Sequence, residues 1–258
     1  MEINCSLKKN QRLKVCQGRP RPFFSYFGGK SRVADKIIQK FPEHDIFVEA
    51  FVGGGGSVYW KNTIPNKFVI NDLNKDIIRV YKTAKNSPRN ISSCKPKTNK
   101  RNFDRAKNKS NRSACDVIKL YKNSFGSDGK SFVKRDHKFN SELLTEEHKE
   151  KLKKTKILNQ DFKKVVKAYN RKGVVIYLDP PYVKGGETYE KNGVSPEEVC
   201  DTVRKIKRAK VFISYDNNQR VRKACKRLKI NKISVPYSNL NGGTYSDKNG
   251  KTELLIEN

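Results

Sequence analysis

The chain has 258 residues and a formal net charge of +31, from 57 lysines and arginines against 26 aspartates and glutamates. A length of this order allows one α/β domain with a substantial core, and so large a positive charge indicates a polyanionic partner, with nucleic acid as the first candidate. No apolar run approaches the about 20 residues that span a bilayer, and the N-terminal residues lack the apolar segment of a signal peptide. An anionic membrane surface is not expected to be the partner either, because the charge is spread along the chain. We therefore expect an intracellular protein.

Cysteines and histidines are few and scattered. The six cysteines contain no CxxC pair, and the three histidines (His44, His137 and His148) lack the spacing of metal ligands. In an intracellular protein, this pattern predicts neither a disulfide framework nor a zinc site. Catalysis by a metal or by histidine is therefore not expected.

The first part of the chain alternates between helical and extended segments. Ser31 caps a predicted amphipathic helix that Pro42 ends. Strands and helices are then predicted in turn, over residues 46–51 (strand), 57 onward (helix), 67–72 (strand) and 74–82 (helix). Strands that alternate with helices are typical of a parallel sheet.

Four consecutive glycines, Gly53 to Gly56, follow the first of these strands. Glycines here allow positive φ angles and a close approach of the backbone to a ligand. The run does not match the phosphate loop of ATP-hydrolysing proteins, because no Lys-Ser or Lys-Thr follows at the required offset. Asp72 ends the second strand, where a carboxylate can bind the ribose of an adenosine-containing cofactor.

The alternation stops in the middle of the chain. Residues 82–156 contain 22 lysines and arginines and 8 aspartates and glutamates, a net charge of 22 − 8 = +14. Residues 83–112 are predicted to be a solvated basic loop. In residues 118–139 aromatic side chains alternate with cations, which favours a small DNA-reading hairpin over a charged subdomain without a binding role. The cations assigned to DNA are Lys122, Lys130, Lys134 and Arg135.

The alternation then resumes. Strands are predicted over residues 174–178, 211–215 and 233–237, with helices over 196–207 and 218–228. A turn rich in asparagine and glycine leads to a last strand over 252–257. The last two strands are therefore predicted to form an antiparallel hairpin at the sheet edge.

Asp179-Pro180-Pro181-Tyr182 follows the apolar strand 174–178 directly. That strand delivers Asp179 to the carboxyl end of the sheet, where ligands bind in open α/β folds. Neither proline has an N–H group, so the strand stops in a stiff turn. The turn presents a carboxylate, free carbonyl groups and a phenol ring, which suit a planar base with an exocyclic amine. An ordinary strand-ending aspartate is the alternative.

Five motifs, in this order and spacing, resemble those of DNA adenine-N6 methyltransferases of the Dam type in the alpha arrangement. They are residues 26–30, 47–55, 71–72, 159–162 and 179–182, and residues 252–258 resemble the closing strand of that family. The resemblance implies a Rossmann-like class I methyltransferase sheet with an inserted basic target-recognition subdomain. The implied divisions are a basic N-terminal lead (1–21), a catalytic domain (22–82 and 157–258) and the insertion (83–156).

The resemblance also implies a pocket for S-adenosyl-L-methionine and no metal. The residues implied to contact this cofactor are Tyr26, Lys30, Glu49, Gly53, Gly55, Asp72, Asp161, Phe162 and Asp179. The residues implied to act in catalysis are Asp179, Pro180, Pro181 and Tyr182. Two positions depart from the family, which usually has proline at Ala50 and often tryptophan at Tyr26.

In the implied reaction, the adenine amine donates hydrogen bonds to Asp179 and to the Pro180 carbonyl, and its nitrogen attacks the methyl group directly. The base must first leave the DNA stack, and Tyr182 offers it an aromatic surface. We expect a monomer acting on double-stranded DNA, with a companion restriction endonuclease left open. Two alternatives remain: an enzyme of the same fold acting on cytosine N4 or RNA adenine, and an inactive nucleic-acid-binding relative.

Overall fold

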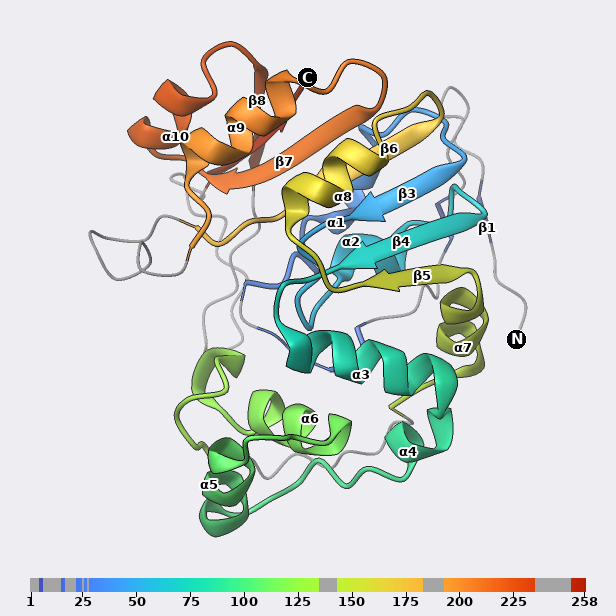
Figure 1. Cartoon of the computed structure of the whole chain (residues 1–258), viewed down its shortest axis with the longest axis vertical. Helices are drawn as coiled ribbons and strands as arrows, with labels where there is room; N and C mark the ends of the chain where they lie inside the picture. Colours follow the sequence, from blue (N-terminus) through green and yellow to red (C-terminus); the bar gives the residue numbers. More distant parts are fainter. Residues whose placement is uncertain are drawn as a thin grey trace.

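A seven-stranded sheet forms the centre of the computed structural model, which describes residues 5–6, 15–16, 22–24, 26, 28–134, 143–182, 193–234 and 252–258 (Figure 1). The strand order is β5-β4-β3-β6-β7-β9-β8. The strands are β3 (Ile46–Glu49), β4 (Lys67–Asn71), β5 (Thr155–Leu158), β6 (Val174–Leu178), β7 (Lys210–Asp216), β8 (Lys229–Ser234) and β9 (Thr252–Glu257). Neighbours from β5 to β7 are parallel, whereas β9 is antiparallel to both β7 and β8. This is the predicted Rossmann-like class I methyltransferase sheet with its antiparallel C-terminal strand.

Helices cover both faces of the sheet and also extend beyond its β5 edge (Figure 1). They are α1 (Ala34–Ile38), α2 (Ser57–Lys61), α3 (Lys75–Asn86), α4 (Pro88–Ser92), α5 (Lys100–Asn108), α6 (Ala114–Lys122), α7 (Glu146–Lys153), α8 (Phe162–Ala168), α9 (Pro196–Arg204) and α10 (Gln219–Ala224). Alternate residues of each strand point to opposite faces. In β6, Val175 and Tyr177 pack with α1, α2 and α3, whereas Ile176 and Leu178 pack with α8 and α9.

The predicted basic loop over residues 83–112 is wrong, because helices form most of it. Helix α3 continues to Asn86, and α4 and α5 follow. Only two side chains of α5, Phe103 and Ala106, are buried, but they pack with Leu120 of α6 and with Phe132. Packing against neighbouring helices therefore stabilises a segment whose own sequence is strongly polar.

The predicted hairpin over residues 118–139 is only partly correct. Residues up to Lys122 belong to α6, and a short 3-10 turn, η1 (Phe125–Ser127), follows. An antiparallel bridge joins Ser124 to Phe132. Residues 135–142, which include Arg135, lie outside the described residues.

Strand β5 was not predicted, and β8 begins earlier than predicted, at Lys229. Residues 235–237 of the predicted strand lie outside the described residues. The antiparallel pairing of the last two strands is confirmed, with β8 at the sheet edge.

Two disulfides contradict the expectation that none forms. Cys94, just after α4, is bonded to Cys115 of α6, and Cys200 of α9 is bonded to Cys225, just after α10. The sequence separations of 21 and 25 residues match no local motif, so only the packing of the helices brings these pairs together. Within the described ranges, no helix has the length and apolar character needed to cross a membrane.

Candidate active site

The candidate residues gather at one edge of the sheet because three adjacent strands end there. Strands β4, β3 and β6 are parallel neighbours. The glycine turn follows β3, Asp72 follows β4 and Asp179 follows β6. Lys30 reaches the same edge from the segment before α1. The carboxyl edge of the sheet is therefore the candidate site, as the sequence predicts.

Asp179 and Lys30 form a largely buried ion pair. The Lys30 Nζ atom lies 2.9 Å from Asp179 Oδ1, and the side chains are 6% and 17% exposed. Lys30 Nζ also donates a hydrogen bond to the Gly28 carbonyl (3.1 Å). Apart from Lys30, Asp179 Oδ1 has no partner among the described residues. A buried carboxylate oxygen is thus left able to accept a further N–H donor.

Burial sets the charge state of Asp179. It raises the pKa of this carboxyl to about 6, although Lys30 acts in the opposite direction. Glu253 of β9 contributes to the rise as a nearby negative charge. Asp179 is therefore ionised at neutral pH but becomes protonated in mildly acidic solution.

Tyr182 completes the Asp-Pro-Pro-Tyr turn. Its ring centroid lies 4.4 Å from Lys30 Nζ and 6.1 Å from the ring centroid of Tyr215. Its hydroxyl is buried and makes no well-formed hydrogen bond with the described residues. Burial, with the charges of Asp179 and Glu253, raises the pKa of Tyr182. The phenol therefore stays neutral, and its ring is fixed beside Asp179.

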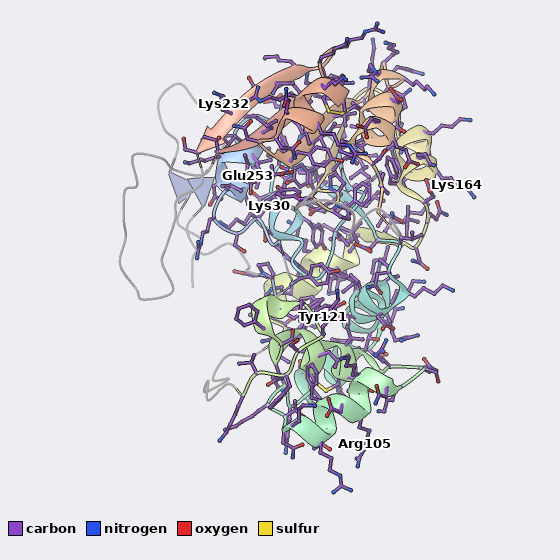
Figure 2. All side chains as sticks on the ribbon, turned by 90° about the vertical axis from the view of Figure 1, so that its left-hand side faces the viewer. Lys30, Arg105, Tyr121, Lys164, Lys232 and Glu253 are labelled. Carbon is purple, nitrogen blue, oxygen red and sulfur yellow. A yellow bond between two sulfur atoms is a disulfide. The ribbon has the colours of Figure 1, made fainter. Side chains whose placement is uncertain are left out.

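Glu253 is a site residue that sequence reasoning did not identify. The β7–β9 register pairs Ser214 with Leu255 and Asp216 with Glu253. Alternation then puts Glu253 on the same face as Leu255, which packs with Tyr177 from the face of Asp179. Glu253 and Lys30, both labelled in Figure 2, act on the charge of Asp179 in opposite directions. The alternation within the predicted strand 252–257 could have shown that Glu253 and Leu255 share one face. It could not have shown that β7 is the strand beside them.

Asp72 ties the glycine turn to the end of β4. Its Oδ2 accepts a hydrogen bond from Gly53 N (2.9 Å) and its Oδ1 from Asn74 N (2.8 Å). Burial raises the pKa of Asp72, and these backbone N–H groups oppose the rise. Each oxygen keeps a second lone pair, so the carboxylate can still accept hydrogen bonds from a ligand.

Close packing against Tyr26 requires glycine in the turn. A Cβ atom on Gly54 would collide with the Phe24 ring and lie 2.7 Å from the Tyr26 ring, and one on Gly53, whose φ is +54°, would lie 3.1 Å from the Tyr26 ring. At Gly55 the contacts are ordinary, with 3.5 Å to the nearest atom. Gly54, which was not singled out in the sequence, is therefore more constrained than Gly55.

Glu49 lies beneath the turn. Its Oε2 accepts a hydrogen bond from the backbone N–H of Tyr59 in α2 (2.7 Å), and the side chain is buried. Burial, and secondarily the charge of Asp179, raises the pKa of Glu49 well above its usual range. Glu49 thus supports α2 and the turn, and its contact with a cofactor stays a prediction.

Asp161 and Phe162 differ in their accessibility. Asp161 caps α8, where its side chain accepts a hydrogen bond from Lys163 N (2.8 Å). Phe162 is buried, and its ring packs against Phe51 with 5.1 Å between centroids. Leu73, next to Asp72, is by contrast 69% exposed. An apolar residue between Asp72 and Asn74 is a local sign of a ligand contact that the sequence analysis did not use.

The cations assigned to DNA lie around the turn that follows α6. Lys122 ends α6 and is half-buried, which lowers its pKa. Lys130 and Lys134 follow the turn and are exposed. Between them and α6, Phe125 is 72% exposed, a high value for so large an apolar side chain. The described part of this segment is therefore a basic surface with an aromatic side chain in solvent.

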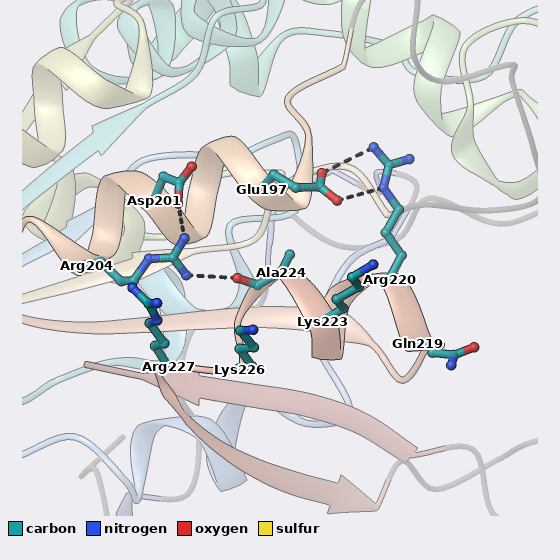
Figure 3. A pocket seen from close by; sticks show the side chains of 9 residues that line it. All are labelled: Glu197, Asp201, Arg204, Gln219, Arg220, Lys223, Ala224, Lys226 and Arg227. Carbon is teal, nitrogen blue, oxygen red and sulfur yellow. Dashed lines mark hydrogen bonds and ion pairs between the residues drawn. The ribbon is translucent and has the colours of Figure 1, made fainter.

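A cavity of about 710 Å³ lies between α9 and α10, but the candidate residues do not line it (Figure 3). Two ion pairs lie among its lining residues, Arg220–Glu197 (3.0 Å) and Arg204–Asp201. Within the described ranges, no group of three or more His, Cys, Asp or Glu side chains could hold a metal ion.

The chain is similar in sequence to known DNA methyltransferases. Residues 26–239 match the family model of the D12 class N6 adenine-specific DNA methyltransferases. The chain is 27% identical to the type II methyltransferase M1.LlaDCHI of Lactococcus lactis subsp. cremoris, over 92% of this chain and 95% of the relative. It is 26% identical to a DNA adenine methylase of Haemophilus influenzae, over 89% and 91%. Among solved structures, it aligns with a SAM-dependent methyltransferase of Agrobacterium tumefaciens with a TM-score of 0.41 and 9% identity, over 87% of this chain and 58% of the other.

Proposed function

The chain belongs to the D12 class of N6 adenine-specific DNA methyltransferases, and on that premise we propose that it takes the methyl group from S-adenosyl-L-methionine at the sheet edge that carries Asp179 and Asp72. Membership of this family favours adenine N6 in DNA as the target over the alternatives of cytosine N4 and RNA adenine. The observation that carries the site assignment is the buried Asp179 Oδ1, which Lys30 keeps charged and which can accept a further hydrogen bond.

The chemistry requires the chain to activate a poor nucleophile. The lone pair of the adenine amine is delocalised into the ring. Hydrogen bonds from its two N–H groups to the Asp179 carboxylate and the Pro180 carbonyl favour a pyramidal nitrogen with an available lone pair. Oriented acceptors stabilise the positive charge that develops on this nitrogen, and positioning supplies much of the acceleration. When bound, the cofactor would supply a sulfonium-linked methyl group that a nitrogen lone pair can attack directly. The sulfur–carbon bond would break as the nitrogen–carbon bond forms, the thioether would leave, and the amine would lose one proton to water.

The residues around Asp72 fit the adenosine part of this cofactor. The Asp72 carboxylate retains lone pairs for the two ribose hydroxyls, and its hydrogen bond to Gly53 N fixes the turn beside it. The exposed Leu73 side chain supplies an apolar surface for a planar base. Because Phe162 is buried, we assign the face of the cofactor's adenine to Leu73 instead, and we keep Asp161 at the edge of the ring.

We assign DNA recognition to the insertion, residues 83–156. Together with Lys82 it carries a net charge of +14, which suits the phosphate backbone. Phe125, exposed beside Lys130 and Lys134, suits contact with bases. Tyr182, at the reacting edge, then stacks on the extruded adenine. A monomer acting on double-stranded DNA inside the cell remains the prediction for partner and setting.

The test is expression in a host that lacks DNA methylation, followed by sequencing that detects N6-methyladenine. We expect the modified base at a defined short sequence with the wild-type chain, and none with Asp179→Ala, while circular dichroism shows that the variant is folded. Activity of Asp179→Ala within about tenfold of wild type would contradict the site assignment.

A further inference from the structure

Tyr26 is packed between the glycine turn and the insertion. On one side, its ring fills the space that a Cβ atom on Gly53 or Gly54 would occupy. On the other side, its ring centroid lies 4.8 Å from that of Tyr121, the second-last residue of α6. An aromatic side chain of the insertion thus contacts a residue assigned to the cofactor.

Tyr121 in turn contacts the turn that carries Phe125. A Cβ atom on Gly129 would lie 3.1 Å from the Tyr121 ring, so the backbone closes tightly on it. The Ser124 Oγ atom, which follows α6 closely, accepts a hydrogen bond from Gly129 N (2.7 Å). Direct contacts therefore run from the glycine turn through Tyr26 and Tyr121 to the turn of residues 124–132.

This turn has an unusual backbone. Gly126, Ser127 and Gly129 have φ angles of +57°, +59° and +72°. The left-handed region is unfavourable for a non-glycine residue such as Ser127, and such strain persists only where neighbouring contacts impose it. The bridge between Ser124 and Phe132 is a short one. Backbone hydrogen bonds such as Phe125 N to the Ser131 carbonyl (3.0 Å) also hold the turn, and the Tyr121 ring is the part of its support that connects it to Tyr26.

The polar surroundings of Tyr121 point to the same pocket. Burial raises the pKa of its hydroxyl, whereas side-chain hydrogen bonds with Tyr26 and Asn74 lower it. Asn74 donates its backbone N–H to Asp72, the residue assigned to the ribose. The hydroxyl end of Tyr121 thus lies between the two ends of the proposed cofactor pocket.

We propose that Tyr121 is a positioning residue that couples the cofactor pocket to the DNA-reading turn of residues 124–132. This inference rests on the proposed function. A ligand that fixes Tyr26 restricts Tyr121 and favours the arrangement of the turn that binds DNA. Because coupling between two binding sites is reciprocal, DNA must then tighten cofactor binding by the same factor as the cofactor tightens DNA binding.

The experiment measures this factor in both directions. The affinity of a fluorescent duplex that contains the methylated sequence is measured by anisotropy, with and without saturating S-adenosylhomocysteine. The affinity of S-adenosylhomocysteine is measured by calorimetry, with and without the duplex. For the wild-type chain we expect a coupling factor of about 5 or more in both directions.

Variants at Tyr121 distinguish the loss of its ring contact from a general loss of folding. Tyr121→Ala should bring the factor close to 1, whereas Tyr121→Phe should keep most of it, because the ring makes the contact with Tyr26 and Gly129. Phe125→Ala is the matched control: it should weaken DNA binding equally with and without S-adenosylhomocysteine and leave the factor unchanged. Tyr121→Leu, which nearly fills the space, replaces Tyr121→Ala if the alanine variant does not fold.

The outcomes are distinct. A wild-type factor near 1, or a wild-type factor in Tyr121→Ala, would overturn the inference. Failure of the wild-type chain to bind S-adenosylhomocysteine would overturn the proposed function and the inference with it. Methylation of DNA without coupling would overturn the inference alone.

Discussion

The Lys30 ammonium group lies 2.9 Å from Asp179 Oδ1 and 4.4 Å from the centre of the Tyr182 ring, so one cation contacts the first and last side chains of the Asp-Pro-Pro-Tyr turn. The cation opposes the rise in the pKa of Asp179 that burial causes. It also occupies a face of a ring assigned to the target base. The protonation of Asp179 and the setting of Tyr182 therefore depend on the same lysine.

The single-turnover rate of methyl transfer should depend on the ionisation of Asp179. Its pKa of about 6 means that it is a hydrogen-bond acceptor above pH 6 and increasingly protonated below. We expect the rate to be constant near neutrality and to fall by about tenfold per pH unit well below pH 6. Lys30→Met removes the group that lowers this pKa, so the fall should begin at higher pH. Lys61→Met, at a lysine paired with Asp35 instead, should keep the wild-type profile. Identical profiles for the two variants would contradict this role of Lys30.

Tyr182 should act through its ring rather than its hydroxyl. Because the hydroxyl is buried without a well-formed hydrogen bond, its removal in Tyr182→Phe should cost little. Tyr182→Ala should lose stacking worth about 1–3 kcal/mol. Fluorescence of 2-aminopurine at the target position reports extrusion of the base and should fall in Tyr182→Ala only. A large loss in Tyr182→Phe would mean that the hydroxyl, through Glu253, is what matters.

Asp72 should control affinity for S-adenosyl-L-methionine. Asp72→Ala removes the proposed ribose contact and also the hydrogen bond that holds Gly53, so affinity should fall at least tenfold by calorimetry. Asp76→Ala, in the following helix α3, breaks partly buried ion pairs with Arg79 and Arg112; it is the control and should bind the cofactor normally. Asp72→Ala should still bind DNA at low salt. Equal cofactor affinities in the two variants would contradict the pocket.

The disulfide between Cys94 and Cys115 should stabilise the insertion. A closed loop of this length, with a sequence separation of 21, contributes about 3 kcal/mol through the entropy of the unfolded chain. Urea unfolding of the double variant Cys94→Ser and Cys115→Ser should show a loss of this order relative to the oxidised wild-type chain. Dithiothreitol should then reduce the stability of the wild-type chain by more than that of the variant. Free thiols at both positions in the purified protein, detected by mass spectrometry, would refute the pairing.

DNA affinity should fall steeply with salt because the insertion is strongly basic. Lys95 and Lys97 are exposed lysines of the insertion, and replacing both with alanine should reduce the slope of log K against log [salt] by about 0.9 for each DNA phosphate that these lysines neutralise. The effect should be the same for all DNA sequences. Lys164 and Lys167 of α8 form the control pair. Helix α8 packs on one face of the sheet, and α4 and α6 of the insertion pack with the core on the other face. An equal change of the slope for both pairs would mean that DNA affinity depends on the total charge of the protein and not on contacts made by the insertion.

Sequence patterns predicted those helices and strands whose own residues carry a clear apolar periodicity. Strands β6 and β9 match their predicted ranges because each is an apolar or alternating run bounded by turns. Strand β5 was missed because Thr155 follows a run of lysines and only the pairing with β4 makes the segment extended. Helix α5 was missed for a similar reason, since its few buried side chains need α6 beside them.

Some residues of the candidate site could likewise be predicted from the sequence, and others could not. The motif residues Lys30, Asp72 and Asp179 could be placed at one edge because parallel neighbouring strands end together. Glu253 could not, because its place depends on β9 lying next to β7, which no local pattern encodes. The contact between Tyr26 and Tyr121 depends on how the insertion packs, and the sequence carries no signal for it.

The position of β9 between β7 and β8 has a consequence for the order in which the protein assembles on the ribosome. Strand β8 is synthesised first, yet among the described strands its only neighbour is β9. Until β9 emerges, β8 has no hydrogen-bonding partner in the sheet and Glu253 is missing from beside Asp179. A nascent or truncated chain that ends before Thr252 thus has its Asp-Pro-Pro-Tyr turn but lacks the strand that completes the sheet beside it, and we expect such a chain not to transfer a methyl group.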